Sequence, residues 1–205
     1  MFKLILIILG VLVAVISENQ LLIGSLIIGS LLFILITNRD KPNVFHLCFG
    51  FITLKILEMI IFENFIIYES NTLSSMWINA IIFSIHFITD LFFFLFVLFR
   101  APLSRIVLLA INKPIDNIYM YQAEFAFMSL YVVLMLVDLA ALLENFIRHL
   151  DQLGFSDEIA EHFTNWTWIF YHYIEIKSSL VGIFFILLWS MTSKFGQKKH
   201  TTTSA

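Results

Sequence analysis

The sequence predicts an all-α membrane protein, built as a single bundle of transmembrane helices. Of its 205 residues, 60% are hydrophobic and 13% are charged, whereas soluble domains average about 45–50% apolar and about 25% charged residues. The apolar residues gather into long runs that short polar connections separate. The chain also contains 23 Phe but only 3 Pro, a composition that suits helices packed in lipid.

The apolar runs predict six transmembrane helices within one domain, residues 1–193. The predicted spans are about 2–16, 21–36, 45–69, 76–99, 118–146 and 162–193. The first two are short for a hydrocarbon core of about 30 Å, so they need polar residues at their ends, and one kinked helix is the alternative. Segment 100–114 is too short to cross and predicts an amphipathic interfacial helix. Residues 194–205 predict a short, basic, disordered cytoplasmic tail.

The basic residues predict the orientation of the bundle. Nine of the 12 Lys and Arg residues lie at the termini or in the second and fourth connections. The positive-inside rule then places both termini in the cytoplasm, which suits a bacterial-type inner or plasma membrane. Trp77, Trp166 and Trp168 would lie at the outer interface. The nine residues are Lys3, Arg39, Lys41, Arg100, Arg105, Lys113, Lys194, Lys198 and Lys199.

Two stretches of the chain resemble each other and suggest an internal repeat. FGFITLK at 49–55 is answered by FAFMSLY at 125–131, and both copies continue to an ENF tripeptide, at 63–65 and 144–146. A true duplication would relate spans three and four to spans five and six as a parallel repeat, as in many transporters. Chance similarity between Phe-rich helices is the alternative.

Several predicted spans contain ionisable side chains that are expensive in hydrocarbon. Each costs roughly 2.5–3.5 kcal/mol on insertion scales, so such residues normally face a protein interior or a water-filled path. Lys55 and Glu58 are three residues apart and can pair on one helix face. The fifth span carries a polar stripe at intervals of seven, and the fourth and sixth each carry a histidine about one turn from an acid. These residues are Glu124, Tyr131 and Asp138, then His86 with Asp90, and His172 with Glu175.

These intramembrane groups predict a transporter or permease component. Acids outnumber bases among them, which favours a cation or a proton-coupled solute over an anion. Histidines beside carboxylates are usual parts of proton relays. The predicted transport path or proton relay consists of Glu58, His86, Asp90, Asp138, His172 and Glu175, with Lys55 as an internal counter-ion.

Two other functional classes remain open from the sequence. The first is a non-catalytic accessory or immunity-type protein, whose charges pair with the membrane helices of a partner or of a second copy. The second is a redox protein that holds a divalent metal, with His86, His172, Asp90 and Glu175 as candidate ligands. A haem between the two histidines is the other form of this hypothesis. No cofactor is predicted, and the motifs of common enzymes are absent from the sequence.

The single cysteine and the basic tail each exclude one class of interaction. The single cysteine, Cys48, excludes a disulfide framework within the chain, and its apolar neighbours indicate a buried structural thiol. The basic tail has too few charges for nucleic-acid binding, so the lipid bilayer is the expected partner, with anionic lipid near the tail.

Overall fold

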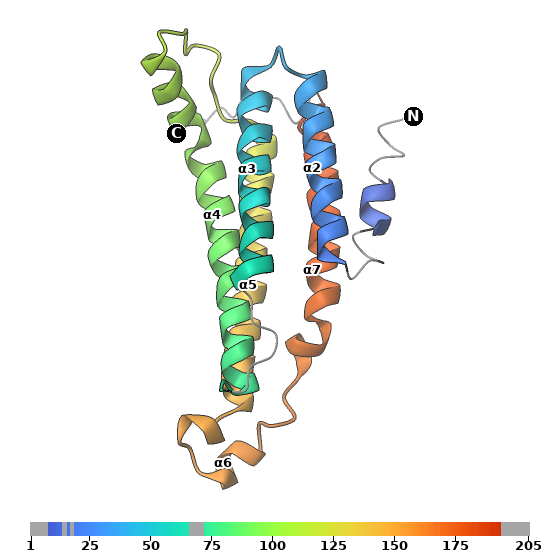
Figure 1. Cartoon of the computed structure of the whole chain (residues 1–205), viewed down its shortest axis with the longest axis vertical. Helices are drawn as coiled ribbons and strands as arrows, with labels where there is room; N and C mark the ends of the chain where they lie inside the picture. Colours follow the sequence, from blue (N-terminus) through green and yellow to red (C-terminus); the bar gives the residue numbers. More distant parts are fainter. Residues whose placement is uncertain (1–7, 14–15, 17–18, 66–71, 194–205) are drawn as a thin grey trace, which may run out of the picture.

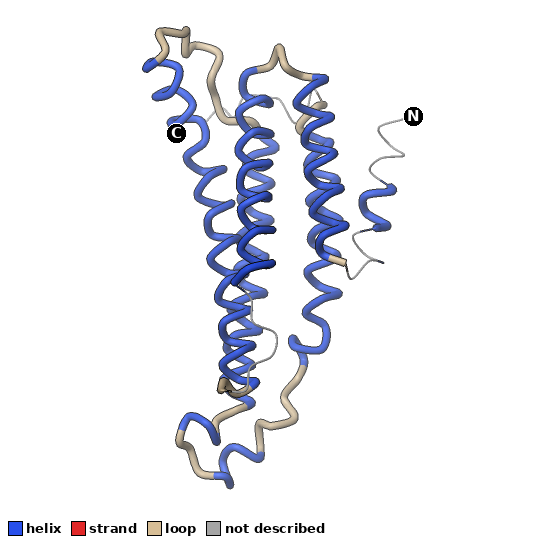
Figure 2. Tube along the Cα trace, in the orientation of Figure 1, coloured by secondary structure: helices blue, strands red, loops and turns tan. Residues whose placement is uncertain are grey.

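The computed structural model is a bundle of long helices and contains no strand in the part that it describes, residues 8–13, 16, 19–65 and 72–193. Figure 1 shows the long helices running side by side, and Figure 2 shows loops and turns between consecutive helices. The elements are α2 (Gln20–Thr37), α3 (Pro42–Phe65), α4 (Ser75–Ala110), α5 (Gln122–Arg148), the 3₁₀ turn η1 (Asp151–Leu153), α6 (Asp157–Glu161) and α7 (Trp168–Ser190).

Local residues suit the starts of α2, α3 and α5, where the first backbone N–H groups of a helix have no partner within it. The side chain of Asn19 accepts from Leu22 N at the start of α2. Pro42 opens α3, a position where its missing N–H costs nothing. In the first turn of α5, the carboxylate of Glu124 accepts from the backbone N–H of Tyr121 at 2.7 Å. These residues help to set where α2, α3 and α5 begin.

Four helices are long and apolar enough to cross a membrane, namely α3, α4, α5 and α7. They support an integral membrane protein with several spans, but they do not confirm the predicted number of six. Helix α2 is apolar and shorter than the other four. The predicted first span lies largely outside the described residues, although 8–13 are helical.

Helix α4 differs from the sequence prediction at its C-terminal end. The predicted span stopped at residue 99 and a separate interfacial helix followed, yet α4 continues without a break to Ala110. Pro102 lies inside the helix. Because proline has no backbone N–H, one hydrogen bond of the helix is missing there, yet the helix continues. At 1.5 Å per residue α4 is about 54 Å long, which exceeds a hydrocarbon core of about 30 Å.

The internal repeat is not confirmed. Each repeat copy is preceded by a Lys-Pro pair, at 41–42 and 113–114. Pro42 begins α3, whereas Pro114 lies in the connection before α5. Glu63 and Glu144 also have different surroundings, since Glu63 is exposed and Glu144 is buried. Glu144 accepts from the backbone N–H groups of Ile169 and Phe170 at 2.8 and 2.9 Å, and so caps the start of α7.

The helices pack in pairs around an aromatic core. Helix α4 packs along α5, α5 along α7, and α2 along α3, while α3 also contacts α4. The ring of Phe51 is fully buried and contacts aromatic rings from three other helices. Those rings belong to Phe93, Phe96, Phe127, Tyr131 and Phe184. We call this set, with Phe51, the aromatic layer.

Candidate functional site: a cavity lined by ionisable side chains

A cavity of about 140 Å³ lies among α2, α3, α4, α5 and α7. Its apolar wall comes largely from α2 and from the aromatic layer, while ionisable and phenolic side chains from α3, α4, α5 and α7 form the polar wall. The residues of the polar wall are Lys55, Glu58, His86, Asp90, Tyr131, Tyr173, Lys177 and Ser178. Residues far apart in the sequence therefore line one common cavity.

Lys177 of α7 joins two acids from two other helices. Its Nζ lies 2.7 Å from Oδ2 of Asp90 on α4 and 2.8 Å from Oδ1 of Asp138 on α5. Asp138 is fully buried, and its Oδ1 also accepts a hydrogen bond from the phenol of Tyr173 at 2.7 Å. The cluster holds three helices together and puts the Asp90 carboxylate and the Lys177 ammonium on the cavity wall.

Lys55 and Glu58 form the ion pair that their spacing predicts. Lys55 Nζ donates to Glu58 Oε2 at 2.7 Å, and both side chains line the cavity. About 19% and 18% of these two side chains is exposed, so the pair stays accessible from the cavity. It contributes one positive and one negative charge to the same space as Lys177 and Asp90.

His86 lies in the cavity wall but does not pair with Asp90. Its ring packs against those of Phe62 and Tyr173, with centroids 4.4 and 5.9 Å apart. Asp90 sits one turn further along α4 and accepts from Lys177 instead. The spacing of His86 and Asp90 predicted that they lie on the same face of one helix. The packing of α7 brings Lys177 to the Asp90 carboxylate, so the lysine rather than the histidine is its partner.

A second polar cluster lies at the end of the bundle where α3 begins. The guanidinium of Arg100 forms a two-pronged ion pair with the carboxylate of Glu124. It also donates to Oδ1 of Asn43 and to the carbonyl of Tyr119, each at 2.7 Å. Arg100 and Glu124 are fully buried. Arg100, which the sequence placed in a cytoplasmic connection, is therefore part of the packed interior.

The aromatic layer separates this second cluster from the cavity. Along α3, Phe51 lies between Asn43 and Lys55, and along α5, Phe127 lies between Glu124 and Asp138. The same order holds on α4, where the layer residues Phe93 and Phe96 lie between the two polar groups. On three helices the aromatic layer therefore lies between the two polar regions, on the side of the cavity that faces the start of α3.

His172 and Glu175, the last two residues of the predicted path, do not line the cavity. They lie on the opposite face of α7, where 64% and 76% of their side chains are exposed. His172 Nδ1 and Glu175 Oε2 are 2.9 Å apart. The structure thus brings together Glu58, His86 and Asp90 in the cavity wall, with Asp138 directly behind Lys177, and separates this other pair from them.

The side chains of the cavity do not form a typical metal site. In the described part of the chain, no group of three or more His, Cys, Asp or Glu residues is placed to hold a metal ion. His86 and His172 occupy different faces of the bundle, so they do not face each other across a common ligand. Cys48 is buried in the apolar core, as its neighbours in the sequence indicated.

The comparisons with known proteins add no relative. No protein-family model, no curated protein and no solved structure matches the chain. The function must therefore be argued from the residues of the site.

Lys177, Tyr131 and Tyr173 belong to the cavity wall although the predicted path did not include them. Lys177 was visible in the sequence as a lysine deep within a span, a position that calls for an acidic partner. Its distance from Asp90 and Asp138 along the chain hid the pairing. Tyr131 was visible as the middle member of the stripe on α5, and all three members of that stripe are indeed buried.

Proposed function

We propose that this protein is a small integral membrane transporter or channel-like component that moves a proton, a small cation, or a solute coupled to one of them. The observation that carries the proposal is the convergence of ionisable side chains from α3, α4 and α7 on one cavity within the membrane-spanning part. Such residues are costly in lipid and normally mark a pathway for ions or protons.

The balance of charge in the cavity favours a positively charged ligand. Three carboxylates, of Glu58, Asp90 and Asp138, face the two ammonium groups of Lys55 and Lys177. One carboxylate charge therefore remains to be compensated when all five groups are ionised. A proton or a monovalent cation supplies that charge with a minimal change of volume, which fits a cavity of about 140 Å³.

The surroundings of the cavity suit controlled access more than an open pore. The aromatic layer closes the side that faces Arg100, and Phe51 fills its centre. A ligand would therefore enter from the other side, between α3 and α7, and would pass the layer only when its rings change rotamer. The basic residues Arg39 and Lys41 lie on the side that faces Arg100, so the positive-inside rule favours a cytoplasmic location for that side in this proposal.

The proposal can be tested with purified protein in lipid vesicles. Vesicles that contain a pH-sensitive dye report proton flux under a potassium diffusion potential, and sodium or potassium gradients replace the proton gradient in parallel samples. We expect flux above that of protein-free vesicles. Glu58→Gln and Asp90→Asn should each reduce it at least about tenfold, equivalent to about 1.4 kcal/mol in the barrier.

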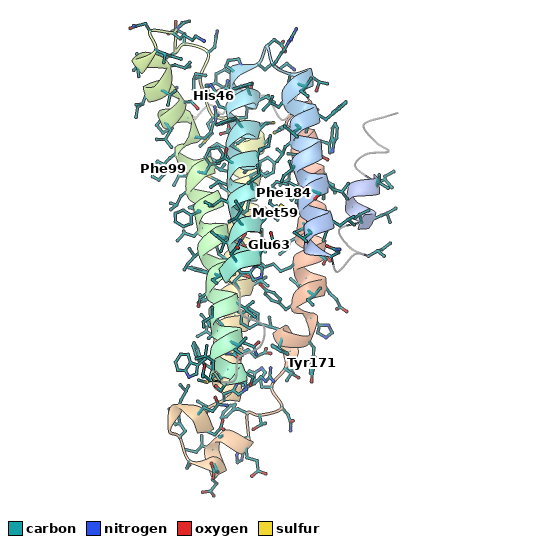
Figure 3. All side chains as sticks on the ribbon, in the orientation of Figure 1. His46, Met59, Glu63, Phe99, Tyr171 and Phe184 are labelled. Carbon is teal, nitrogen blue, oxygen red and sulfur yellow. The ribbon has the colours of Figure 1, made fainter. Side chains whose placement is uncertain are left out.

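Glu63→Gln is the matched control, because Glu63 is an exposed acid on the same helix as Glu58 (Figure 3) and does not line the cavity. This variant should keep the wild-type flux. Equal flux in the wild-type protein, Glu58→Gln and Asp90→Asn would show that the cavity is not the pathway.

A further inference from the structure

The outer face of α7 carries a polar pair that the bundle does not cover. His172 and Glu175 bind each other at 2.9 Å, and most of each side chain is exposed. Among the described residues, no hydrogen bond joins either side chain to another helix. Every other ion pair in the structure lies at least partly inside the bundle, so this pair is exceptional in the described part of the chain.

The depth of the pair makes its exposure expensive. Helix α7 begins at Trp168, so His172 and Glu175 lie roughly 6 and 10 Å along its axis. The short side chain of Glu175 reaches the headgroup region from that depth less easily than a lysine would. A polar pair at such a position is stabilised when a second helix supplies hydrogen-bond partners.

The residues beside the pair form the pattern of a helix-packing seam. Trp168, His172, Glu175, Ser179 and Ile186 follow one another at intervals of four, three, four and seven, and all five are exposed. Such spacing is the heptad pattern by which one straight helix packs along another. Ser179 is small, which permits close approach of the two backbones. The seam thus permits close packing of a neighbouring helix at Ser179 and hydrogen bonding with it at His172 and Glu175.

We propose that this seam binds the same seam of a second copy of the chain, so that α7 packs against α7 across a two-fold axis normal to the membrane. The reason for choosing a second copy is that the pair is self-complementary. A two-fold interface needs one patch that carries both halves of each interaction. The imidazole of His172 in one copy then faces the carboxylate of Glu175 in the other, and the reciprocal contact forms across the axis.

Cross-linking between introduced cysteines tests the arrangement directly. In a Cys48→Ala background, which removes the native thiol, Ser179→Cys places a thiol in the middle of the seam. Leu136→Cys is the matched control, because Leu136 is 58% exposed on α5 and lies at a similar depth from its helix end. Oxidation in lipid bicelles should give a covalent dimer for Ser179→Cys and only monomer for Leu136→Cys.

Energy transfer between labelled copies, measured as the bicelles are diluted with lipid, provides a second readout. Glu175→Leu should weaken dimerisation at least about tenfold relative to wild type, whereas Leu136→Ala should leave it unchanged. The proposal is overturned if the wild-type chain is monomeric, as it would be if another protein's helix or the lipid headgroups satisfied the pair. Equal cross-linking at Ser179→Cys and Leu136→Cys would overturn it as well.

Discussion

Replacing Arg100 with methionine should destabilise the bundle more than any change at its surface. Arg100 makes four hydrogen bonds, two to Glu124, one to Asn43 and one to the carbonyl of Tyr119. About 1% of its side chain is exposed, and none of that of Glu124. Arg100→Met keeps an unbranched side chain but leaves the Glu124 carboxylate buried without its cation.

The expected loss follows from the burial of both charges. Removing one partner of a buried ion pair costs about 3–5 kcal/mol, because the remaining charge is uncompensated. In Arg100→Met/Glu124→Gln no charge is left unpaired, and the amide oxygen still accepts from the backbone N–H of Tyr121. We therefore expect the double variant to be at least about 1.5 kcal/mol more stable than the sum of the two single changes predicts.

The assay is the free energy of unfolding in mixed micelles, obtained by titration with a denaturing detergent. Arg39→Met is the control, since Arg39 is exposed at the same end of the bundle and surface changes usually stay within about 0.5 kcal/mol. A loss below about 1 kcal/mol for Arg100→Met, or strict additivity with Glu124→Gln, would refute the view that this buried pair is structurally essential.

Two further predictions concern packing and capping. Gly50→Ala should lower the free energy of unfolding by about 1–3 kcal/mol, because its Cβ would lie 1.9 Å from an aromatic ring atom of α4. Gly29→Ala is the control, because a Cβ at that position meets no atom within 4 Å. In the same titration this control should be neutral or stabilising by up to about 1 kcal/mol. Glu144→Ala should lower the free energy of unfolding by about 1–2 kcal/mol, since it removes the acceptor for two N–H groups of α7. Hydrogen exchange should accelerate in the first turn of that helix. Unchanged exchange there would contradict the capping role.

Features that depend on neighbouring residues were predictable from the sequence. The apolar runs identified the long helices, and the spacing of Lys55 and Glu58 predicted their ion pair. Each of these depends on residues within one or two turns, where helix geometry leaves little freedom. The inward orientation of the stripe through Tyr131 on α5 was predictable for the same reason.

Features that depend on how one helix rotates against another were not predictable. Lys177 binds Asp90 and Asp138, which are 87 and 39 residues away in the chain. His172 and Glu175 had the same local pattern as the pair on α4, yet α7 turns them away from the cavity. A one-dimensional pattern gives the depth of a residue in a span, but the packing of neighbouring helices decides which way that residue faces.

The end of α4 shows a related difficulty. An arginine followed two residues later by a proline usually marks the end of a span, and Arg100 with Pro102 had that appearance. The fully buried carboxylate of Glu124 makes it favourable for Arg100 to remain in the bundle. Arg100 directly follows the predicted fourth span, and Glu124 lies six residues after the predicted start of the fifth span at 118. This similarity of depth in adjacent spans was the available signal for their pairing.

Lys177 has a consequence for how any ligand of the cavity would bind. Its ammonium group is a cation attached covalently to the site, at 2.7 Å from Asp90, so the carboxylates are never without a competitor. A soluble cation therefore shares the carboxylates with a tethered one, whose effective concentration is fixed by a short linker and does not fall on dilution. Wherever a soluble cation takes the place of the Lys177 ammonium beside Asp90, the ion pair that joins α7 to α4 is lost.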